Sequence, residues 1–153
     1  MAQKYVIGID AGTTGCRTII FDLEGNEIGS GYRDNPLRFP QAGWVELDPQ
    51  TLIDNCYAST REALGKSAIN PKDVASISFT YMRSALILRD KDGNFARDIQ
   101  MWQDMRSASM FPWMTERLAE HGMSPDDLYA ITGYPYSTVW MSGKIFWIRQ
   151  HEP

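Results

Sequence analysis

The sequence predicts an α/β protein in which a mixed sheet is covered by helices. Short β-branched and apolar segments near the start of the chain are separated by turn residues, as in consecutive hairpins. A segment with apolar residues at helical spacing follows, and a further strand-like segment comes directly after it. Strands joined by hairpins, then a helix and a return strand, together make a mixed sheet with helices packed on it.

The first three strands are expected in two successive hairpins. Residues 5–10 are apolar and rich in β-branched side chains, which is typical of a buried strand. Residues 16–22 are again rich in strand-forming side chains. The turn signal at residues 24–26 then allows residues 27–33 to return as a third strand.

The first helix is expected after an irregular stretch that is rich in proline and glycine, residues 35–43. Asp48 is a good helix cap, and Pro49 suits the first helical position. Apolar residues then recur at helical spacing, so we expect a helix over residues 49–66. The alternating segment 74–81 is the expected return strand.

The remainder of the chain is expected to be mainly helical. Residues 85–89 predict one more strand, which a following turn closes. A helix is expected from about residue 104 to residue 120, and Pro112 should kink or divide it. Ser124 has the pattern of a cap for a short helix, and the aromatic-rich residues 142–150 predict a final helix.

Length and composition favour a folded protein with one core. The chain has 153 residues, of which 43% are hydrophobic and 22% charged. Its net charge is −4 and its basic residues are scattered, so nucleic acid is not an expected partner. No stretch approaches the roughly 20 apolar residues of a membrane span, and no apolar signal region precedes the first strand. We therefore expect a cytoplasmic protein without a membrane partner.

The two cysteines, Cys16 and Cys56, lie far apart in the sequence. One falls in a strand-like stretch and the other in a helix-like stretch, and no CxxC pair is present. Neither a disulfide framework nor a zinc site is therefore expected.

The turn between the first two strands, residues 10–15, has the composition of an anion site. Gly12 and its small neighbours let backbone N–H groups approach a phosphate closely. The hydroxyls of Thr13 and Thr14 add donors, and Asp10 at the strand end can hold a divalent cation through water. A tight hairpin in which Asp10 accepts backbone hydrogen bonds explains the same residues. Both interpretations stay open on these residues alone.

Several segments resemble those of the FGGY carbohydrate kinases, a branch of the actin, hexokinase and heat-shock ATPase superfamily. Residues 7–17 (IGIDAGTTGCR) resemble the first phosphate motif of that family. Residues 43–49 (GWVELDP) are similar to a segment of glycerol kinases, and residues 79–84 fall where the family carries an arginine-bearing sugar loop.

Further matches follow in the same order along the chain. Residues 102–106 (WQDMR) resemble a xylulokinase motif, while residues 132–133 and 144–148 are similar to the end of the family's first lobe. The resemblance spans residues 5–153 and implies a ribonuclease H-like fold, a mixed sheet with flanking helices, as in the actin and hexokinase superfamily.

The resemblance implies roles at the phosphate turn. Asp10 would position magnesium and the phosphates of ATP, and Gly12 would belong to the same turn. Thr13 and Thr14 would face the phosphoryl group that is transferred, and Arg17 would lie near it. An arginine on an alternating strand is also explained as a solvated charge.

The resemblance also implies a substrate site formed by Arg83, Ser84, Trp102 and Asp104. Arginine and carboxylate groups bind the hydroxyls of a polyol, and a tryptophan face packs on its C–H surface. Two alternatives stay open on the residues alone. Trp102 is explained equally well as core filling, and Asp104 as the cap of the helix that follows.

The chain departs from the family at three substrate positions. Glycerol kinases carry Arg-Glu where this chain has Arg83-Ser84, and xylulokinases carry Met-His where it has Met82-Arg83. An aromatic residue of glycerol kinases aligns near Val139 and so is missing here. Neither glycerol nor xylulose is therefore expected, and another polyol, a ketose or a small hydroxylated signal molecule stays open.

The expected activity is ATP-dependent phosphorylation of a hydroxyl on a small sugar or polyol. Residues 1–153 would be a portion of the N-terminal lobe, with the catalytic base and most of the nucleotide-binding lobe in a C-terminal part that this sequence lacks. We therefore expect this portion to be inactive alone. A homodimer of the full-length protein is compatible with the resemblance. The alternative is a nonenzymatic, actin-like module for nucleotide binding or assembly.

Overall fold

The computed structural model describes residues 4–152 and divides them into two compact units. The first unit comprises residues up to 37 together with residues 47–83, and the second comprises residues 38–46 and those from 84 onward. Each unit has its own cluster of buried apolar side chains. The expectation of a single core is therefore wrong, because the chain crosses between the units three times and each builds a separate interior.

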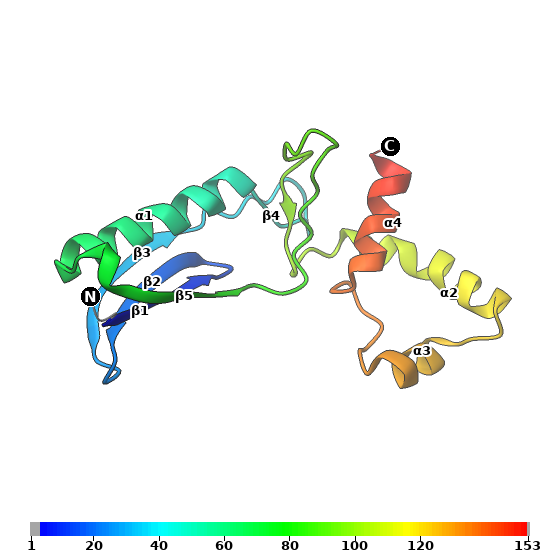
Figure 1. Cartoon of the computed structure of the whole chain (residues 1–153). Coiled ribbons are helices and arrows are strands. Elements are labelled where there is room, and N and C mark those ends of the chain that lie inside the picture. Colours follow the sequence, from blue (N-terminus) through cyan, green and yellow to red (C-terminus); the bar gives the residue numbers. More distant parts are fainter. Residues whose placement is uncertain (1–3, 153) are drawn as a thin grey trace. The chain divides into compact units, whose positions relative to one another are not determined.

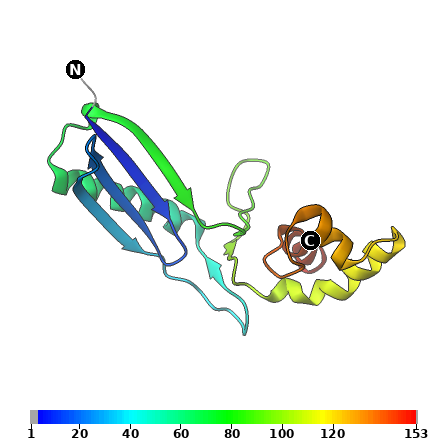
Figure 2. The same ribbon diagram turned by 90° about the horizontal axis from the view of Figure 1, so that it is seen from below.

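The first unit is a four-stranded mixed sheet with one long helix on one face (Figure 1). The strand order is β3-β2-β1-β5, with β1 antiparallel to β2, β2 antiparallel to β3, and β1 parallel to β5. Figure 2 shows the four strands side by side with the helix behind them. The elements are β1 (Tyr5–Ala11), β2 (Gly15–Asp22), β3 (Glu27–Asp34), α1 (Pro49–Ser67) and β5 (Val74–Tyr81).

These elements confirm the predicted fold class and most of the predicted bounds. The side chain of Asp48 caps α1 by accepting hydrogen bonds from the backbone N–H groups of Gln50 and Thr51. α1 packs mainly on β3 and β2, and it covers a core built around Ile7, Ile9, Ile20 and Ala63.

The edge strand β5 is less covered than the rest of the sheet. Ile77, Phe79 and Tyr81 alternate along it and are 54%, 63% and 72% exposed. They share a face with their partners on β1, because paired residues of neighbouring strands point to the same side. The sheet is thus well covered where α1 lies and open towards β5.

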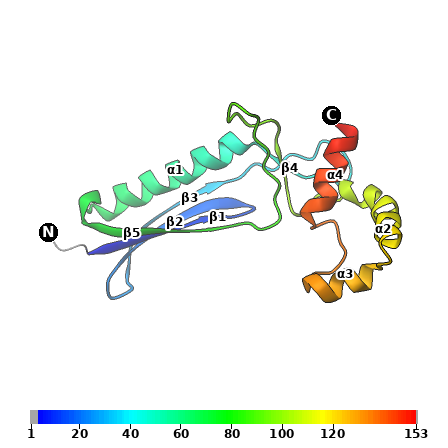
Figure 3. The same ribbon diagram turned by 45° about the vertical axis from the view of Figure 1, so that its right-hand side comes forward.

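The second unit contains short strands, a 3₁₀ turn and three helices (Figure 3). Its apolar cluster is centred on Met110, Met114 and Trp147, with further aromatic rings packed against it. The elements are β4 (Glu46–Leu47), which spans the boundary between the units, β6 (Ile99–Gln100), which pairs with it, the 3₁₀ turn Arg106–Met110, α2 (Phe111–Glu120), α3 (Pro125–Thr132) and α4 (Met141–His151).

One predicted element of the second unit needs correction, and another is divided as Pro112 predicts. Residues 85–89 form no regular strand but only isolated bridges, from Leu86 to Gln100 and from Arg89 to Phe95. The helix expected over residues 104–120 is divided, with a 3₁₀ turn up to Met110 and an α-helix from Phe111. Pro112 explains the division, because proline lacks an N–H group and is tolerated in the first turn of a helix.

The predicted short helix begins at its expected cap. The Ser124 hydroxyl accepts a hydrogen bond from the Asp127 N–H (3.1 Å), and the Asp127 carboxylate accepts one from the Ser124 N–H (2.8 Å), which is a complete capping box. No helix within residues 4–152 is long and apolar enough to cross a membrane.

Candidate functional site

The phosphate-turn candidate is held on its carbonyl side by two residues of the neighbouring strand and the loop after it. The Gly12 N–H donates to the Gly15 carbonyl across the turn (3.0 Å). The Asn35 side-chain amide donates to the Gly12 carbonyl (2.8 Å), and the Asn35 N–H donates to the Thr14 carbonyl (2.8 Å). The Tyr32 hydroxyl also reaches the Thr14 carbonyl (3.4 Å). Asn35 is buried, so the turn rests on an interior support.

Glycine is required at both ends of this turn by close approach of neighbouring atoms. A Cβ atom at Gly12 would lie 3.1 Å from the Gly15 carbonyl oxygen and 3.6 Å from each carboxylate oxygen of Asp10. A Cβ atom at Gly15 would lie 2.6 Å from the Arg33 carbonyl oxygen and would also overlap the Tyr32 ring. Gly12 therefore leaves open the space beside the Asp10 carboxylate that a side chain would occupy.

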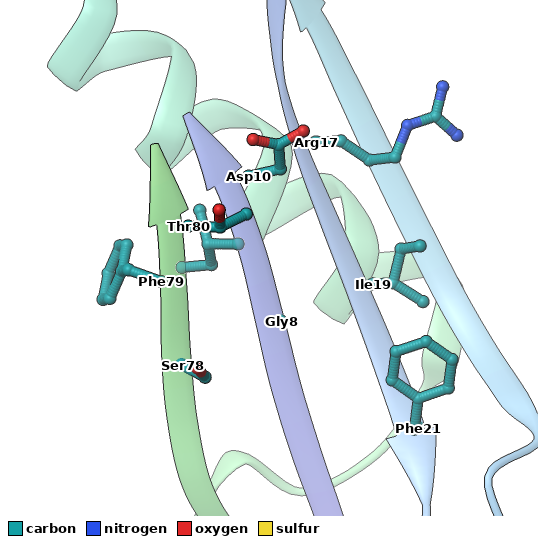
Figure 4. Close-up of a pocket in the computed structure, with 9 residues that line it drawn as sticks. Gly8, Asp10, Arg17, Ile19, Phe21, Ser78, Phe79 and Thr80 are labelled. Carbon is teal, nitrogen blue, oxygen red and sulfur yellow. The ribbon is translucent and has the colours of Figure 1, made fainter. Parts of the chain in front are cut away.

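Asp10 and Arg17 lie opposite each other on β1 and β2, and both are exposed. The Arg17 guanidinium lies over the ring of Tyr32, with 5.2 Å between the guanidinium carbon and the ring centroid. Figure 4 shows the Asp10 carboxylate at the end of β1 and the Arg17 side chain extending towards β3. A carboxylate and a guanidinium thus stand at the same end of the sheet as the turn. A carboxylate can bind magnesium, and a guanidinium can bind a phosphate.

The carboxylate of Asp10 suits magnesium better than it suits a cation that needs a full protein cage. Within residues 4–152, no three His, Cys, Asp or Glu side chains are grouped as a metal ligand set. Magnesium usually keeps several waters and binds through one or two carboxylates plus substrate phosphates. A single exposed carboxylate beside the turn at residues 12–15 is compatible with that mode of binding.

A shallow pocket of about 240 Å³ extends from Asp10 and Arg17 along the sheet. Its apolar lining includes Ile19 and Phe21 of β2 (Figure 4). It lies on the face of the sheet opposite α1, because Asp10 alternates with the buried Ile7 and Ile9, which face that helix.

The predicted sugar loop contains the boundary between the two units. Arg83 is the last residue of the first unit and is exposed, and Ser84 is the first residue of the second. Ser84 has a backbone φ of 59°, in the left-handed region that a non-glycine residue rarely adopts. Such strain is often stored where function depends on backbone position.

Lys144 holds the carbonyl groups of two candidate loops in the second unit. Its ammonium group donates to the Ser84 carbonyl (3.1 Å) and to the Met101 carbonyl, which directly precedes Trp102. The side chain is fully buried. Burial lowers the Lys144 pKa to about 8, against a smaller opposite effect of the Asp104 charge. Lys144 therefore positions Ser84 and the start of the 102–106 motif.

A pocket of about 280 Å³ in the second unit contains Ser84 and two aromatic rings. Tyr134 and Trp140 lie 6.3 Å apart between ring centroids, at an angle of 52°. Val139, where the motif comparison lacks an aromatic residue, lines the same pocket. Tyr134 therefore supplies an aromatic ring in the pocket of Ser84, whereas the motif comparison with glycerol kinases expects the aromatic residue near position 139.

Asp104 is fully buried and its carboxylate is surrounded by donors. It accepts hydrogen bonds from the Val45 N–H (2.7 Å), from the Gln100 side chain (3.0 Å) and from the Arg106 backbone and guanidinium (2.7–3.0 Å). Burial alone would raise the Asp104 pKa, but the hydrogen bonds from Arg106 and Val45 outweigh it and the pKa lies below its ordinary value. These contacts favour a structural role, and substrate contact stays a prediction.

Arg106 connects the two motifs of the second unit, residues 43–46 and 102–106. Its guanidinium bonds to Glu46 (2.7 Å) and Asp104 (2.7 Å), and it lies 3.7 Å above the ring of Trp44. The Met105 N–H donates to the Gly43 carbonyl (2.8 Å). Trp102 is 42% exposed, so it is not core filling. The two motifs are therefore structural partners that present Trp102 at the surface.

The chain matches a known protein family over nearly its whole length. The sequence profile of the FGGY family of carbohydrate kinases, N-terminal domain, matches residues 5–153. The chain belongs to this family. The FGGY assignment confirms the resemblance drawn from the five motifs.

Relatives and solved structures agree with the FGGY assignment. The chain is 32% identical over 151 residues to a glycerol kinase of Thermococcus gammatolerans, covering 99% of this chain and 29% of that protein. It is 35% identical over 147 residues to a glycerol kinase of Paenarthrobacter aurescens, covering 95% of this chain and 28% of that protein. The crystal structure of xylulose kinase from Rhodospirillum rubrum superposes with a TM-score of 0.87 at 27% identity, covering 98% of this chain and 30% of that one. The chain therefore spans less than a third of the length of the relatives it matches.

Four residues at the candidate sites were not predicted as site residues from the sequence. Tyr32 and Asn35 support the phosphate turn from outside its motif, and Tyr134 and Lys144 line or position the pocket around Ser84. Lys144 carried a partial signal, because it begins the segment 144–148 that resembles the end of the family's first lobe. The other three carried none that periodicity or composition reveals.

Proposed function

We propose that this chain supplies the phosphate end and part of the substrate end of a site that transfers the terminal phosphoryl group of ATP to a hydroxyl of a small sugar or polyol. The observation that carries the proposal is the turn at residues 12–15, supported by Asn35, with the exposed Asp10 carboxylate beside it. Membership of a carbohydrate kinase family supports the reaction class.

Asp10 would hold magnesium through water and so bring the ion to the phosphates of ATP. ATP with magnesium supplies the phosphoryl group and neutralises its developing charge. Backbone N–H groups and hydroxyls at Thr13 and Thr14 would orient that group, and Arg17, held over Tyr32, would lie close enough to add positive charge. The base that accepts the substrate proton would lie in a continuation of the chain, as the length of its relatives suggests.

The substrate end would involve Arg83, Ser84 and Trp102, with Tyr134 as an additional ring. Arg83 and Trp102 are exposed, and Ser84 shares a pocket with Tyr134. An aromatic face packs on the C–H groups of a sugar, while arginine and serine bond its hydroxyls. Asp104 would act on this site through Arg106 and the 102–106 loop, because its own oxygens are buried.

The test uses the chain continued to the length of its relatives, with ADP release measured across a panel of sugars and polyols. At least one of them should stimulate turnover, and Asp10→Asn should lower that turnover by about 100-fold or more, as for loss of a charge-stabilising group. Asp54→Asn, which makes the same charge change on exposed α1 of the first unit, is the matched control and should be near normal. Residues 1–153 alone should give no sugar-dependent turnover.

Two results would overturn the proposal. One is a panel in which no sugar or polyol stimulates ADP release and Asp10→Asn has no effect. The other is assembly or nucleotide binding that no sugar changes, which would instead favour an actin-like module.

A further inference from the structure

The two cysteines meet in the interior of the first unit. Cys16 on β2 and Cys56 on α1 are 40 residues apart in the sequence, yet their sulfur atoms lie 3.3 Å apart. Both are free thiols, Cys16 fully buried and Cys56 half-buried. A disulfide has a sulfur separation of about 2 Å, so the two sulfurs need to approach by little more than about 1 Å.

We propose that Cys16 and Cys56 form a modification site, in which a hydroperoxide oxidises the two thiols to an intramolecular disulfide. The packing of α1 on β2 brings the sulfurs into contact before any oxidant is present. The site depends on no assumption about the kinase reaction.

The chemistry divides into two steps that balance. In the first, the Cys56 thiolate attacks the peroxide, so that an S–O bond forms, the O–O bond breaks and hydroxide leaves. In the second, the Cys16 sulfur attacks the Cys56 sulfenic acid, so that the S–S bond forms, the S–O bond breaks and water leaves with the Cys16 proton. Overall, two thiols and hydrogen peroxide give one disulfide and two waters, with sulfur oxidised and peroxide oxygen reduced.

Burial assigns the order of these steps. Cys16 has no exposed surface, whereas Cys56 is only partly buried and is therefore the more accessible of the two residues. Burial, together with the neighbouring Cys56 thiol, raises the Cys16 pKa to about 12, so Cys16 reacts as a thiol whose proton passes to the departing hydroxyl of the Cys56 sulfenic acid. Cys56 is therefore oxidised first, and Cys16 then attacks the Cys56 sulfenic acid.

The disulfide would form directly beneath the phosphate turn. Cys16 follows Gly15, the last residue of the turn, and its sulfur lies 3.8 Å from the Asn35 side chain. The same Asn35 side chain donates to the Gly12 carbonyl (2.8 Å) and accepts from the side chain of Asn55 (2.9 Å), the neighbour of Cys56 on α1. One amide therefore connects the turn, the sulfur of Cys16 and the helix, and oxidation is expected to alter the turn.

The experiment treats folded residues 1–153 with hydrogen peroxide, alkylates the remaining thiols in denaturant, and measures intact mass and proteolytic peptides. The expected product has lost two hydrogen atoms, contains no alkylated thiol, joins the peptides of Cys16 and Cys56, and reverts with dithiothreitol. Amide hydrogen exchange at residues 12–15 should differ between the reduced and oxidised forms.

Two single variants separate the two roles. In Cys56→Ser, the remaining Cys16 should stay unmodified by peroxide, because it is buried. In Cys16→Ala, the remaining Cys56 should gain oxygen or link two chains, because no resolving thiol is present. The wild-type chain in urea should give a mixture of products rather than one internal disulfide, because the contact between the sulfurs is lost.

Three outcomes would overturn the proposal. One is that both thiols remain fully alkylated by the later reagent although peroxide has oxidised an added thiol peptide. Another is that Cys56 gains oxygen while Cys16 stays free. The third is that the folded and urea-unfolded chains give the same mixture of products.

Discussion

The two units of this chain place their charged groups in opposite ways. In the first unit, the charges of the candidate phosphate site, Asp10 and Arg17, stand exposed at the end of a sheet whose covered face is apolar. In the second unit, Asp104, Arg106 and Lys144 are buried, with Arg106 over the ring of Trp44, and they hold loops in position. The difference separates residues that are free to meet a ligand from residues that shape the surface around it.

Each unit also carries its own natural reporter. All five tryptophans lie in the second unit, and both cysteines lie in the first. Tryptophan fluorescence during urea unfolding therefore follows the second unit, and the rate of thiol labelling follows the first. The unfolding of each unit can therefore be followed separately on the same sample.

The largest effect is expected for Arg106→Ala, which should lower the free energy of unfolding of the second unit by about 3–5 kcal/mol, because Asp104 and Glu46 lose their buried partner. The tryptophan transition in urea should move strongly, and thiol labelling of the cysteines should change far less. Arg117→Ala removes an arginine of the same unit from an exposed pair with Glu120 and should have little effect. Equal shifts for the two variants would contradict the buried network.

A smaller effect is expected for Gly15→Ala in the first unit. The added methyl group would overlap the Tyr32 ring and the Arg33 carbonyl, so the unfolding free energy should fall by about 1–3 kcal/mol. Faster labelling of Cys16 would report this loss, with the tryptophan transition little changed. Gly65→Ala on α1 meets no neighbouring atom and should stabilise the same unit by up to about 1 kcal/mol. A neutral Gly15→Ala would show that the turn is not held as closely as described.

The pH dependence of stability should have opposite signs in the two units. The Lys144 pKa falls from 10.5 to about 8, so between these values the unfolded chain holds a proton that the folded chain lacks, and the second unit gains stability as pH rises. The Cys16 pKa rises from 9.0 to about 12, so the folded chain keeps a proton that the unfolded chain loses, and the first unit loses stability as pH rises above about 9.

The measurement is urea unfolding from pH 7.5 upward, where the slope for either group stays below about 1.4 kcal/mol per pH unit. Between pH 8 and 9 the tryptophan midpoint should rise, and Lys144→Met should abolish that rise. Above pH 9 the first unit, followed by circular dichroism of the sheet, should weaken, and Cys16→Ala should remove that trend. A falling tryptophan midpoint in wild-type protein between pH 8 and 9 would contradict the burial of a charged Lys144.

The smallest effects are expected at two helix caps, one in each unit. Asp48→Ala removes the acceptor of two backbone N–H groups and of the Thr51 hydroxyl at the start of α1, and Ser124→Ala breaks the capping box of α3. Each should lower the unfolding free energy by about 1 kcal/mol. Asp48→Ala should act on thiol labelling and Ser124→Ala on tryptophan fluorescence. If each variant shifted both readouts equally, the chain would unfold as one cooperative body.

Much of the first unit could be predicted because its signals are local. The alternation of residues 74–81, the cap at Asp48 and the turn signal at residues 24–26 each act within a few residues, and the structure places the strands and the helix accordingly. The prediction was weaker over residues 85–120. There, isolated bridges stand in place of the strand predicted at residues 85–89. The α-helix begins at Phe111, beside Pro112, and not near residue 104 as predicted.

The candidate site divides in the same way. The sequence by itself determined the α/β class, the family and the composition of the phosphate turn, because these reside in short segments whose residue order is sufficient evidence. Only the tertiary structure decided that Asp104 is buried under Arg106, that Tyr134 shares a pocket with Ser84, and that the sulfurs of Cys16 and Cys56 touch. The physical reason is that such contacts depend on how helices and strands pack across tens of residues of chain, and no local pattern encodes that packing.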